Sequence, residues 1–175
     1  MRINVYGASC SGKSGFAGEV YGILKKNSVS VELVREICKD WAYQKRIPKD
    51  FDQLHLCLSH IKLETQYFDW GINTIITDSP VLLTYIYGEY YNTPCLESHW
   101  DICTEYEKRN DSINILLRVK PEQYSIEGRF QSYSEANVIE KMIIQTLNTL
   151  EIEYKDERNG GLVSYIVEKL NETKH

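Results

Sequence analysis

Residues 7–14, Gly-Ala-Ser-Cys-Ser-Gly-Lys-Ser, fill every position of the pattern G-x-x-x-x-G-K-S, and we call them the phosphate loop. The glycines of this pattern allow consecutive backbone N–H groups to turn inward around a polyphosphate. Its lysine reaches the β- and γ-phosphates of a nucleotide, and its final serine hydroxyl is a ligand for Mg²⁺. The pattern therefore predicts a nucleoside triphosphate site, formed by Gly7, Ser9, Cys10, Ser11, Gly12, Lys13 and Ser14.

The residues on either side of the phosphate loop have the periodicities that the motif requires. Ile3 and Val5 lie in a short extended run that ends at Gly7, which is typical of a strand. After the loop, apolar residues fall on one helical face, at positions Phe16, Val20, Ile23 and Leu24. A strand before the loop and a helix after it favour a true phosphate loop over an ordinary turn of glycine and serine.

Asp78 is the first candidate outside the phosphate loop. It follows residues 73–77, a β-branched run that predicts a buried strand. An aspartate at that position can hold the water shell of Mg²⁺ or accept the proton of an attacking hydroxyl. The alternative is an N-cap for a helix that begins at Ser79 and Pro80. The position after a buried strand favours the catalytic role, with Ser14 and Asp78 as the metal ligands.

Two further charged residues are candidates for catalysis beside Lys13 and Asp78. Glu36 follows a strand predicted over residues 29–34 and could act as a base, although a solvent-exposed charge on a following helix explains it equally well. Arg129 lies in a polar segment, residues 124–135, which we interpret as a short lid. A lid arginine would stabilise the charge that develops on a transferred phosphoryl group.

Strand-like and helix-like segments alternate along the whole chain. This alternation predicts one α/β domain over residues 1–175, with a mostly parallel sheet covered on both faces and ligands at the carboxyl ends of the strands. The later strands are predicted over residues 73–77, 113–119 and 152–155. Helices are predicted over residues 50–70, 80–90, 98–108, 135–150 and 162–170.

Composition limits the possible partners of the protein. A net charge of −5 over 175 residues disfavours binding to a nucleic-acid polymer but permits a small nucleotide. The five cysteines form no C-x-x-C pair, which argues against a zinc site or a disulfide framework and fits a reducing compartment. No stretch is apolar enough to span a bilayer, and the N-terminus resembles a strand rather than a signal peptide. We therefore expect a cytoplasmic protein that has no membrane partner.

Other classes of phosphate-loop protein need features that this sequence lacks. A GTPase requires a guanine-reading N-K-x-D after a strand, and the sequence contains none. A ring-forming motor ATPase normally needs a longer module than 175 residues provide. What remains is a compact ATP phosphotransferase.

The chain resembles the small-molecule and nucleotide kinases of the phosphate-loop class. More narrowly, it is similar to the ATP-binding domain family that includes the ribosylnicotinamide kinase domain of the bacterial NAD regulator. The similarity rests on the phosphate loop and on Val34-Arg35-Glu36, residues 51–67, Asp78-Ser79-Pro80, Gly128-Arg129 and Glu135-Ala136. The resemblance implies a five-stranded parallel sheet in the order 2-3-1-4-5, with ATP as donor and Mg²⁺ as cofactor. Ser79 departs from many relatives, which have an arginine there.

These observations favour an ATP-dependent phosphotransferase that acts on a nucleoside, a nucleotide or a related small molecule. Two alternatives stay open: a kinase of a modified base or end in DNA, which the acidic charge disfavours, and a non-catalytic nucleotide-sensing module. The acceptor, the choice between Glu36 and Asp78 as base, the choice of ATP or GTP, and the existence of a homodimer are not readable from the sequence. An acceptor pocket would draw on scattered side chains such as Gln53, His60, Glu64, Tyr67 and Tyr85.

Overall fold

A computed structural model describes residues 1–37, 41, 46, 48–124 and 131–172. Its centre is a sheet of five parallel strands in the order β2-β3-β1-β4-β5. This arrangement confirms the predicted fold class and strand order. The strands are β1 (Arg2–Tyr6), β2 (Val31–Val34), β3 (Thr74–Thr77), β4 (Ser112–Leu116) and β5 (Lys155–Asp156).

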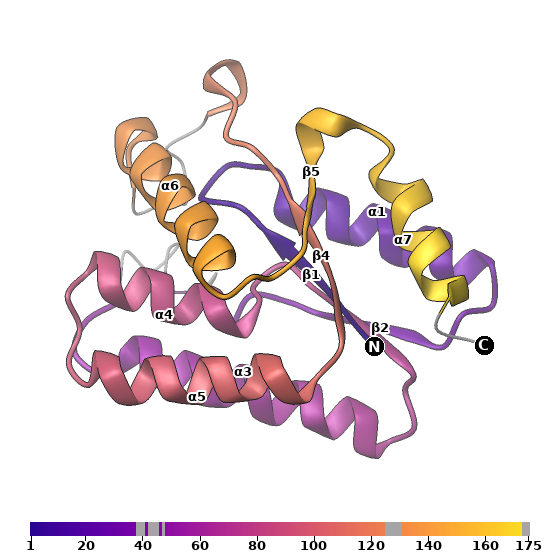
Figure 1. Ribbon diagram of the computed structural model, residues 1–175, viewed down its shortest axis with the longest axis horizontal. Coiled ribbons are helices and arrows are strands. Elements are labelled where there is room, and N and C mark those ends of the chain that lie inside the picture. The colour runs from indigo at the N-terminus through magenta and orange to yellow at the C-terminus, as the bar shows by residue number, and fades with distance from the viewer. Residues whose placement is uncertain (38–40, 42–45, 47, 125–130, 173–175) are drawn as a thin grey trace.

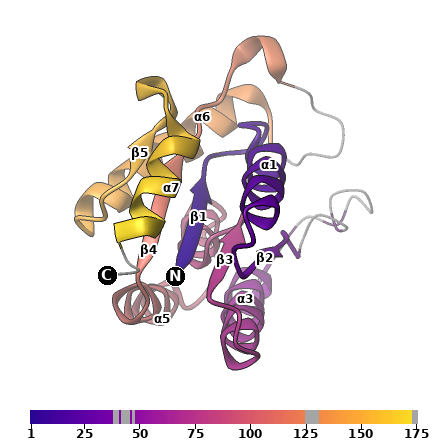
Figure 2. The ribbon, with the colours of Figure 1, turned by 90° about the vertical axis from the view of Figure 1, so that its right-hand side faces the viewer.

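Helices cover both faces of the sheet, as parallel strands require (Figure 1). Helices α1 and α7 lie on one face, which is turned toward the viewer in Figure 2, and α3, α4, α5 and α6 lie on the other. No helix in the described part of the chain is both long enough and apolar enough to cross a bilayer. The helices are α1 (Lys13–Lys26), α3 (Asp52–Asp69), α4 (Val81–Tyr90), α5 (Leu96–Arg109), α6 (Tyr133–Thr149) and α7 (Leu162–Glu172).

The central strand β1 divides the core into two parts. Successive side chains of a strand point to opposite faces, so Ile3 and Val5 pack beneath α1 and α7 while Tyr6 joins the core under α3 to α6. All five residues of β1 are buried, because both faces of the sheet are covered. The phosphate loop therefore follows a strand that is buried on both faces of the sheet.

Several strand boundaries differ from the predicted ones, some by one residue and others by more. β2 begins at Val31 rather than at residue 29, and β4 ends at Leu116 rather than at residue 119. β5 has only two residues, Lys155 and Asp156, and the preceding Ile152 and Tyr154 lie outside the strand and pack against the core on the α4 and α6 side. These shifts leave the order of the strands unchanged.

Candidate functional site

The parallel sheet brings the predicted site residues to one edge. The phosphate loop follows β1, Glu36 follows β2 and Asp78 follows β3. These three strands are neighbours in the order β2-β3-β1, and the carboxyl ends of parallel strands lie at the same edge. Arg129 is the one predicted catalytic residue that lies outside the described residues, and residues 125–130 of the proposed lid lie outside them too.

The phosphate loop has a backbone that depends on its glycines. Gly7 has a φ of 153°, and a Cβ built on it would stand 2.3 Å from the Ser11 Oγ and 2.9 Å from the Leu117 carbonyl oxygen. Gly12, with a φ of 88°, is the N-cap of α1, and Cys10 also has a positive φ, of 62°. The chain therefore makes a tight left-handed path between β1 and α1, with no room for a side chain at Gly7.

Several polar groups of the loop are arranged to receive phosphate oxygens. Helix α1 starts with no side-chain cap and no acidic residue in its first turn, so its N-terminal N–H groups are not covered by a carboxylate. The Ser11 hydroxyl is buried and has no hydrogen-bond partner among the described residues. The Lys13 Nζ donates to the Ala8 carbonyl oxygen at 3.0 Å, which holds the ammonium over the loop, and Ser14 follows on the exposed start of α1.

Asp78 links the ends of two neighbouring strands. Its Oδ1 accepts a hydrogen bond from the backbone N–H of Glu36 at 3.0 Å, and the carboxylate is buried. The N-cap residue of α4 is Pro80, and no side chain caps that helix, so Asp78 does not act as the helix cap that the sequence left open. The hydrogen bond fixes Asp78 and Glu36 relative to each other, beside the phosphate loop.

His60 of α3 belongs to the same region. Burial lowers the pKa of its imidazole, while the nearby carboxylates of Glu36 and Asp78 oppose that shift. The side chain is 1 % exposed, and its Nδ1 has no hydrogen-bond partner among the described residues. The structure thus places His60 near the two candidate acids, and burial favours the uncharged form of this acceptor-side residue suggested by the sequence.

Other suggested acceptor residues lie elsewhere or have structural partners. Glu64 accepts a hydrogen bond from Tyr106 and faces Arg2, at the start of β1 and therefore at the opposite edge of the sheet. Tyr67 packs on Trp70 at the end of α3, and Tyr85 packs on rings of α5. These three side chains belong to the scaffold. Gln53, at the start of α3, is buried.

Arg118 and Lys120, which follow β4, hold the scaffold together rather than a ligand. The Arg118 guanidinium pairs with Asp156 of β5 and with Glu140 of α6, and Lys120 pairs with Glu157. The pKa of the Asp156 carboxyl is lowered by its hydrogen bonds to Arg118 and Arg158, although its partial burial opposes that shift. These ion pairs join the two last strands to α6.

One contact of the phosphate loop has no signal in the sequence. The Ser9 hydroxyl donates to the Gln131 Oε1 at 2.5 Å, and the Gln131 amide donates in turn to the Tyr91 hydroxyl. The Tyr124 hydroxyl donates to the Gln131 carbonyl oxygen at 2.7 Å. Gln131 is buried, so it joins the phosphate loop to the end of α4 and to the start of α6. No spacing rule pairs Ser9 with a glutamine so far along the chain.

Solved structures with a similar fold cover nearly the whole chain. The structure of deoxyadenosine kinase from M. mycoides with the products dCMP and a flexible dCDP has a TM-score of 0.62 and 17% sequence identity, over 98% of this chain and 100% of that one. A structure of the M. mycoides kinase with bound dATP has a TM-score of 0.62 and 19% identity, over 98% and 99%. At these identities the likeness establishes the fold alone, a five-stranded parallel sheet flanked by helices.

Sequence comparison gives the family. Among curated proteins, none matches the chain. A family profile described as an AAA domain, AAA_28, matches residues 2–163, a range that includes the phosphate loop, Glu36 and Asp78. The narrower resemblance to the ribosylnicotinamide kinase family is not confirmed by these comparisons. Because the profile extends from the start of β1 into the first turn of α7, the chain belongs to this family of AAA domains.

Proposed function

We propose that this protein is a kinase that uses ATP and Mg²⁺ to phosphorylate a nucleoside, a nucleotide or a related small molecule. The observation that supports it most is the hydrogen bond from the backbone N–H of Glu36 to the Asp78 carboxylate, which joins the two acid-bearing strand ends at the edge where the phosphate loop begins. A phosphate loop alone would bind a nucleotide, whereas acids beside it can serve a metal ion and an acceptor hydroxyl. The similar kinase structures, which hold dATP, dCMP and dCDP, support a nucleoside or nucleotide acceptor.

Each side chain of the site has a distinct role in this proposal. Lys13 and Arg129 stabilise the charge of the transferring phosphoryl group, and Ser14 and Asp78 organise Mg²⁺. Glu36 is the base, because it is only half-buried and so lies where an acceptor can approach, whereas one oxygen of Asp78 already accepts a backbone N–H. The phosphates would be surrounded by Gly7, Ser9, Cys10, Ser11 and Gly12.

The reaction is a direct transfer between two oxygen atoms. The acceptor oxygen forms a bond to the γ-phosphorus while the bond from that phosphorus to the β–γ bridging oxygen breaks, and Glu36 takes the acceptor proton. Mg²⁺, when bound, neutralises the charge that develops on the phosphate oxygens. His60, which is held neutral at pH 7 by burial, adds no competing positive charge next to Asp78.

The test is a screen of deoxynucleosides, nucleosides and their monophosphates for acceptor-dependent release of ADP, with the phosphorylated product identified by mass. Replacing Lys13 with alanine should lower kcat about 10²- to 10³-fold while the fold is kept, because one preorganised cation is removed from the transferring group. Lys26→Ala, at the exposed C-terminal end of the same helix, is the matched control and should retain the wild-type rate.

The outcomes separate the proposed kinase from the alternatives. Tight nucleotide binding with no acceptor-stimulated turnover across the screen would indicate a nucleotide sensor. Phosphorylation of DNA ends, with binding that weakens steeply as salt is added, would indicate a polymer kinase. Equal rates for wild type and Lys13→Ala would show that the phosphate loop has another role.

A further inference from the structure

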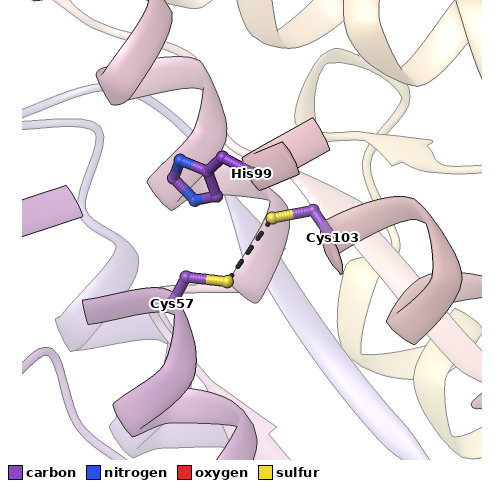
Figure 3. Close-up of side chains that lie close together, drawn as sticks. All are labelled: Cys57, His99 and Cys103. Carbon is purple, nitrogen blue, oxygen red and sulfur yellow. Dashed lines mark hydrogen bonds between the residues drawn. The ribbon is translucent and has the colours of Figure 1, made fainter. Parts of the chain in front are cut away.

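Three metal-ligating side chains meet in the core between α3 and α5, outside the candidate kinase site. They are Cys57 of α3, and His99 and Cys103 of α5 (Figure 3). Each is 0 % exposed, and their ligand atoms all lie within 4.8 Å of one another. His99 and Cys103 are four residues apart, so they share one face of α5 and both point at Cys57.

The distances fit a tetrahedral metal ion. The Cys57 and Cys103 sulfurs are 3.6 Å apart. Two sulfurs bound to one zinc at about 2.3 Å each, with a tetrahedral angle between them, stand roughly 3.8 Å apart. The His99 Nε2 faces the same space and lies 2.9 Å from the Thr84 Oγ1. Small rotations of these side chains would bring two sulfurs and one nitrogen to a common centre.

Not every polar atom of this cluster has a hydrogen-bond partner among the described residues. The His99 Nδ1 is buried and has no hydrogen-bond partner among the described residues. The Thr84 hydroxyl donates to the Val81 carbonyl oxygen at 2.6 Å, so its lone pairs, not its proton, face His99. Coordination at Nε2 would replace its hydrogen bond to Thr84, move the imidazole proton to Nδ1, and leave the Thr84 oxygen as a further ligand for a fourth position.

We propose that Cys57, His99 and Cys103 form a structural site for one Zn²⁺ ion. On binding, the two S–H bonds are exchanged for two Zn–S bonds and both protons leave to solvent, while the His99 proton moves from Nε2 to Nδ1 so that Nε2 supplies an electron pair. Two thiolates and one divalent ion have no net charge, so the filled site suits a dry core, whereas a monovalent ion would leave a buried negative charge. The site would tie α3 to α5 and hold His60, one turn after Cys57, in position.

Binding is tested on the full chain after chelation and reduction. Zn²⁺ titrated against a chromophoric chelator should bind at one ion per chain, and Co²⁺ in its place should show thiolate-to-metal absorption and the strong d–d bands of a tetrahedral site. Loss of an outer-shell partner alone weakens metal sites 10- to 100-fold, so Cys57→Ser and Cys103→Ser should each lower zinc affinity by more than about 100-fold. Cys95→Ser, at an exposed cysteine, is the matched control and should bind as wild type does.

Two measurements need no core variant, in case Cys57→Ser fails to fold. Zn²⁺ at a hundredfold excess over its Kd should raise the unfolding midpoint of the wild-type protein by roughly 5–10 °C. Zinc should also slow alkylation of Cys57 and Cys103, mapped by mass spectrometry, and leave Cys95 unchanged. Zinc binding that survives Cys57→Ser and Cys103→Ser, protection that maps to Cys95, or no zinc binding by the fully reduced wild-type chain would each overturn the proposal.

Discussion

At the scale of single residues, the tightest constraint on the phosphate loop is at Gly7. Gly7→Ala would place a methyl group 2.3 Å from the Ser11 Oγ and 2.9 Å from a backbone carbonyl, at a φ of 153°. The hydroxyl can move but the carbonyl of Leu117 cannot move easily, so the loop must shift. We expect a loss of about 1–3 kcal/mol in the free energy of unfolding, measured in urea, and a much weaker affinity for ATP.

The control for this substitution is Gly18→Ala on α1. Nothing lies within 4 Å of a Cβ at Gly18, and the residue is an exposed helix position. Alanine is favoured over glycine in a helix interior by roughly 0.5–1 kcal/mol, so this variant should be slightly more stable than wild type and should bind ATP normally. Wild-type ATP affinity in Gly7→Ala would show that the loop has more freedom than its contacts indicate.

His60 should make the free energy of unfolding decrease as the pH falls. Its pKa in the folded state is lowered by burial, whereas an unfolded histidine titrates near pH 6.5. Below about pH 6.5 the unfolded chain therefore binds more protons than the folded one, and stability is lost as the pH falls, by up to roughly 1.4 kcal/mol per pH unit. Unfolding in urea at pH 7.5 and at pH 5.5 should show this loss when the wild type is compared with a variant that lacks the imidazole.

His60→Gln removes the titrating group and should flatten that part of the profile. The difference between wild type and variant, taken at each pH, isolates His60 from every other titration. His55→Gln, on an exposed position of α3, is the control and should leave the profile unchanged. Should wild type and His60→Gln lose stability in parallel between pH 7.5 and pH 5.5, the imidazole must already be protonated in the folded state.

At the scale of elements, Gln131 joins the phosphate loop to α4 and to the start of α6. Gln131→Ala would remove the partner of the Ser9 hydroxyl and the donor to Tyr91. A buried group left without its partner costs about 1–3 kcal/mol, and here the cost falls on the phosphate loop. We expect ATP affinity to fall roughly 5- to 100-fold, measured by calorimetric titration, with the far-UV circular dichroism unchanged.

Gln145→Ala is the control that tests whether the loss of ATP affinity requires a glutamine in contact with the phosphate loop. Gln145 is exposed on α6, so its truncation removes no contact of the loop. This control should bind ATP as the wild type does. If Gln131→Ala also binds ATP with wild-type affinity, the Ser9 contact does not help to set the conformation of the loop that binds phosphate.

The elements themselves were predictable where periodicity is strong. The phosphate loop, the long helices and the positions of Glu36 and Asp78 after strands all follow from local pattern, and the structure places them at one edge. The strand order was implied by the resemblance rather than by periodicity. β5 was predicted over residues 152–155, but the strand covers only Lys155 and Asp156. Ile152 and Tyr154 pack instead into a core formed by helices that are distant in sequence, which local pattern does not reveal.

Side-chain partners that are distant in sequence were not predictable. The cysteines gave no C-x-x-C motif, yet α3 and α5 bring Cys57 beside Cys103. The only local signal was the four-residue spacing of His99 and Cys103 on one helix. Arg118 likewise had the residue type of a phosphate ligand, but β5 and α6 supply acids that pair with it. Such contacts follow from how helices pack, which spacing along one chain does not determine.

At the scale of the whole molecule, a network of buried charged side chains lies at the edge of the sheet opposite the phosphate loop. Arg2 of β1 donates to both carboxylate oxygens of Glu107 on α5, at 3.1 and 2.7 Å, and lies 3.9 Å from Glu64 on α3. The Tyr106 hydroxyl donates to Glu64 at 2.9 Å. One guanidinium faces two carboxylates, so a fully ionised network would contain an excess negative charge in the core.

Of the two carboxyl groups, Glu64 is the one whose environment favours the protonated, uncharged form. Burial raises the pKa of the Glu64 carboxyl to about 7, although the Arg2 charge and the Tyr106 hydrogen bond oppose the shift. Between about pH 4.5, where an unfolded glutamate ionises, and pH 7, the folded chain binds more protons than the unfolded one. Stability therefore falls as the pH rises through this window, a slope opposite in sign to that of His60.

Glu64→Gln should remove that slope, because glutamine is neutral at every pH and its oxygen can still accept from Tyr106. Above pH 7 the variant should be more stable than wild type by about 1–3 kcal/mol in urea unfolding, and near pH 4.5 the two should be equal. Glu107→Gln removes the bidentate partner of Arg2 instead, and should destabilise by about 3–5 kcal/mol at both pH values. Two Glu→Gln changes on one arginine would thus act in opposite directions at pH 8. A Glu64→Gln variant less stable than wild type at pH 8 would mean that folding does not raise the pKa of Glu64 and that Arg2 needs both carboxylates.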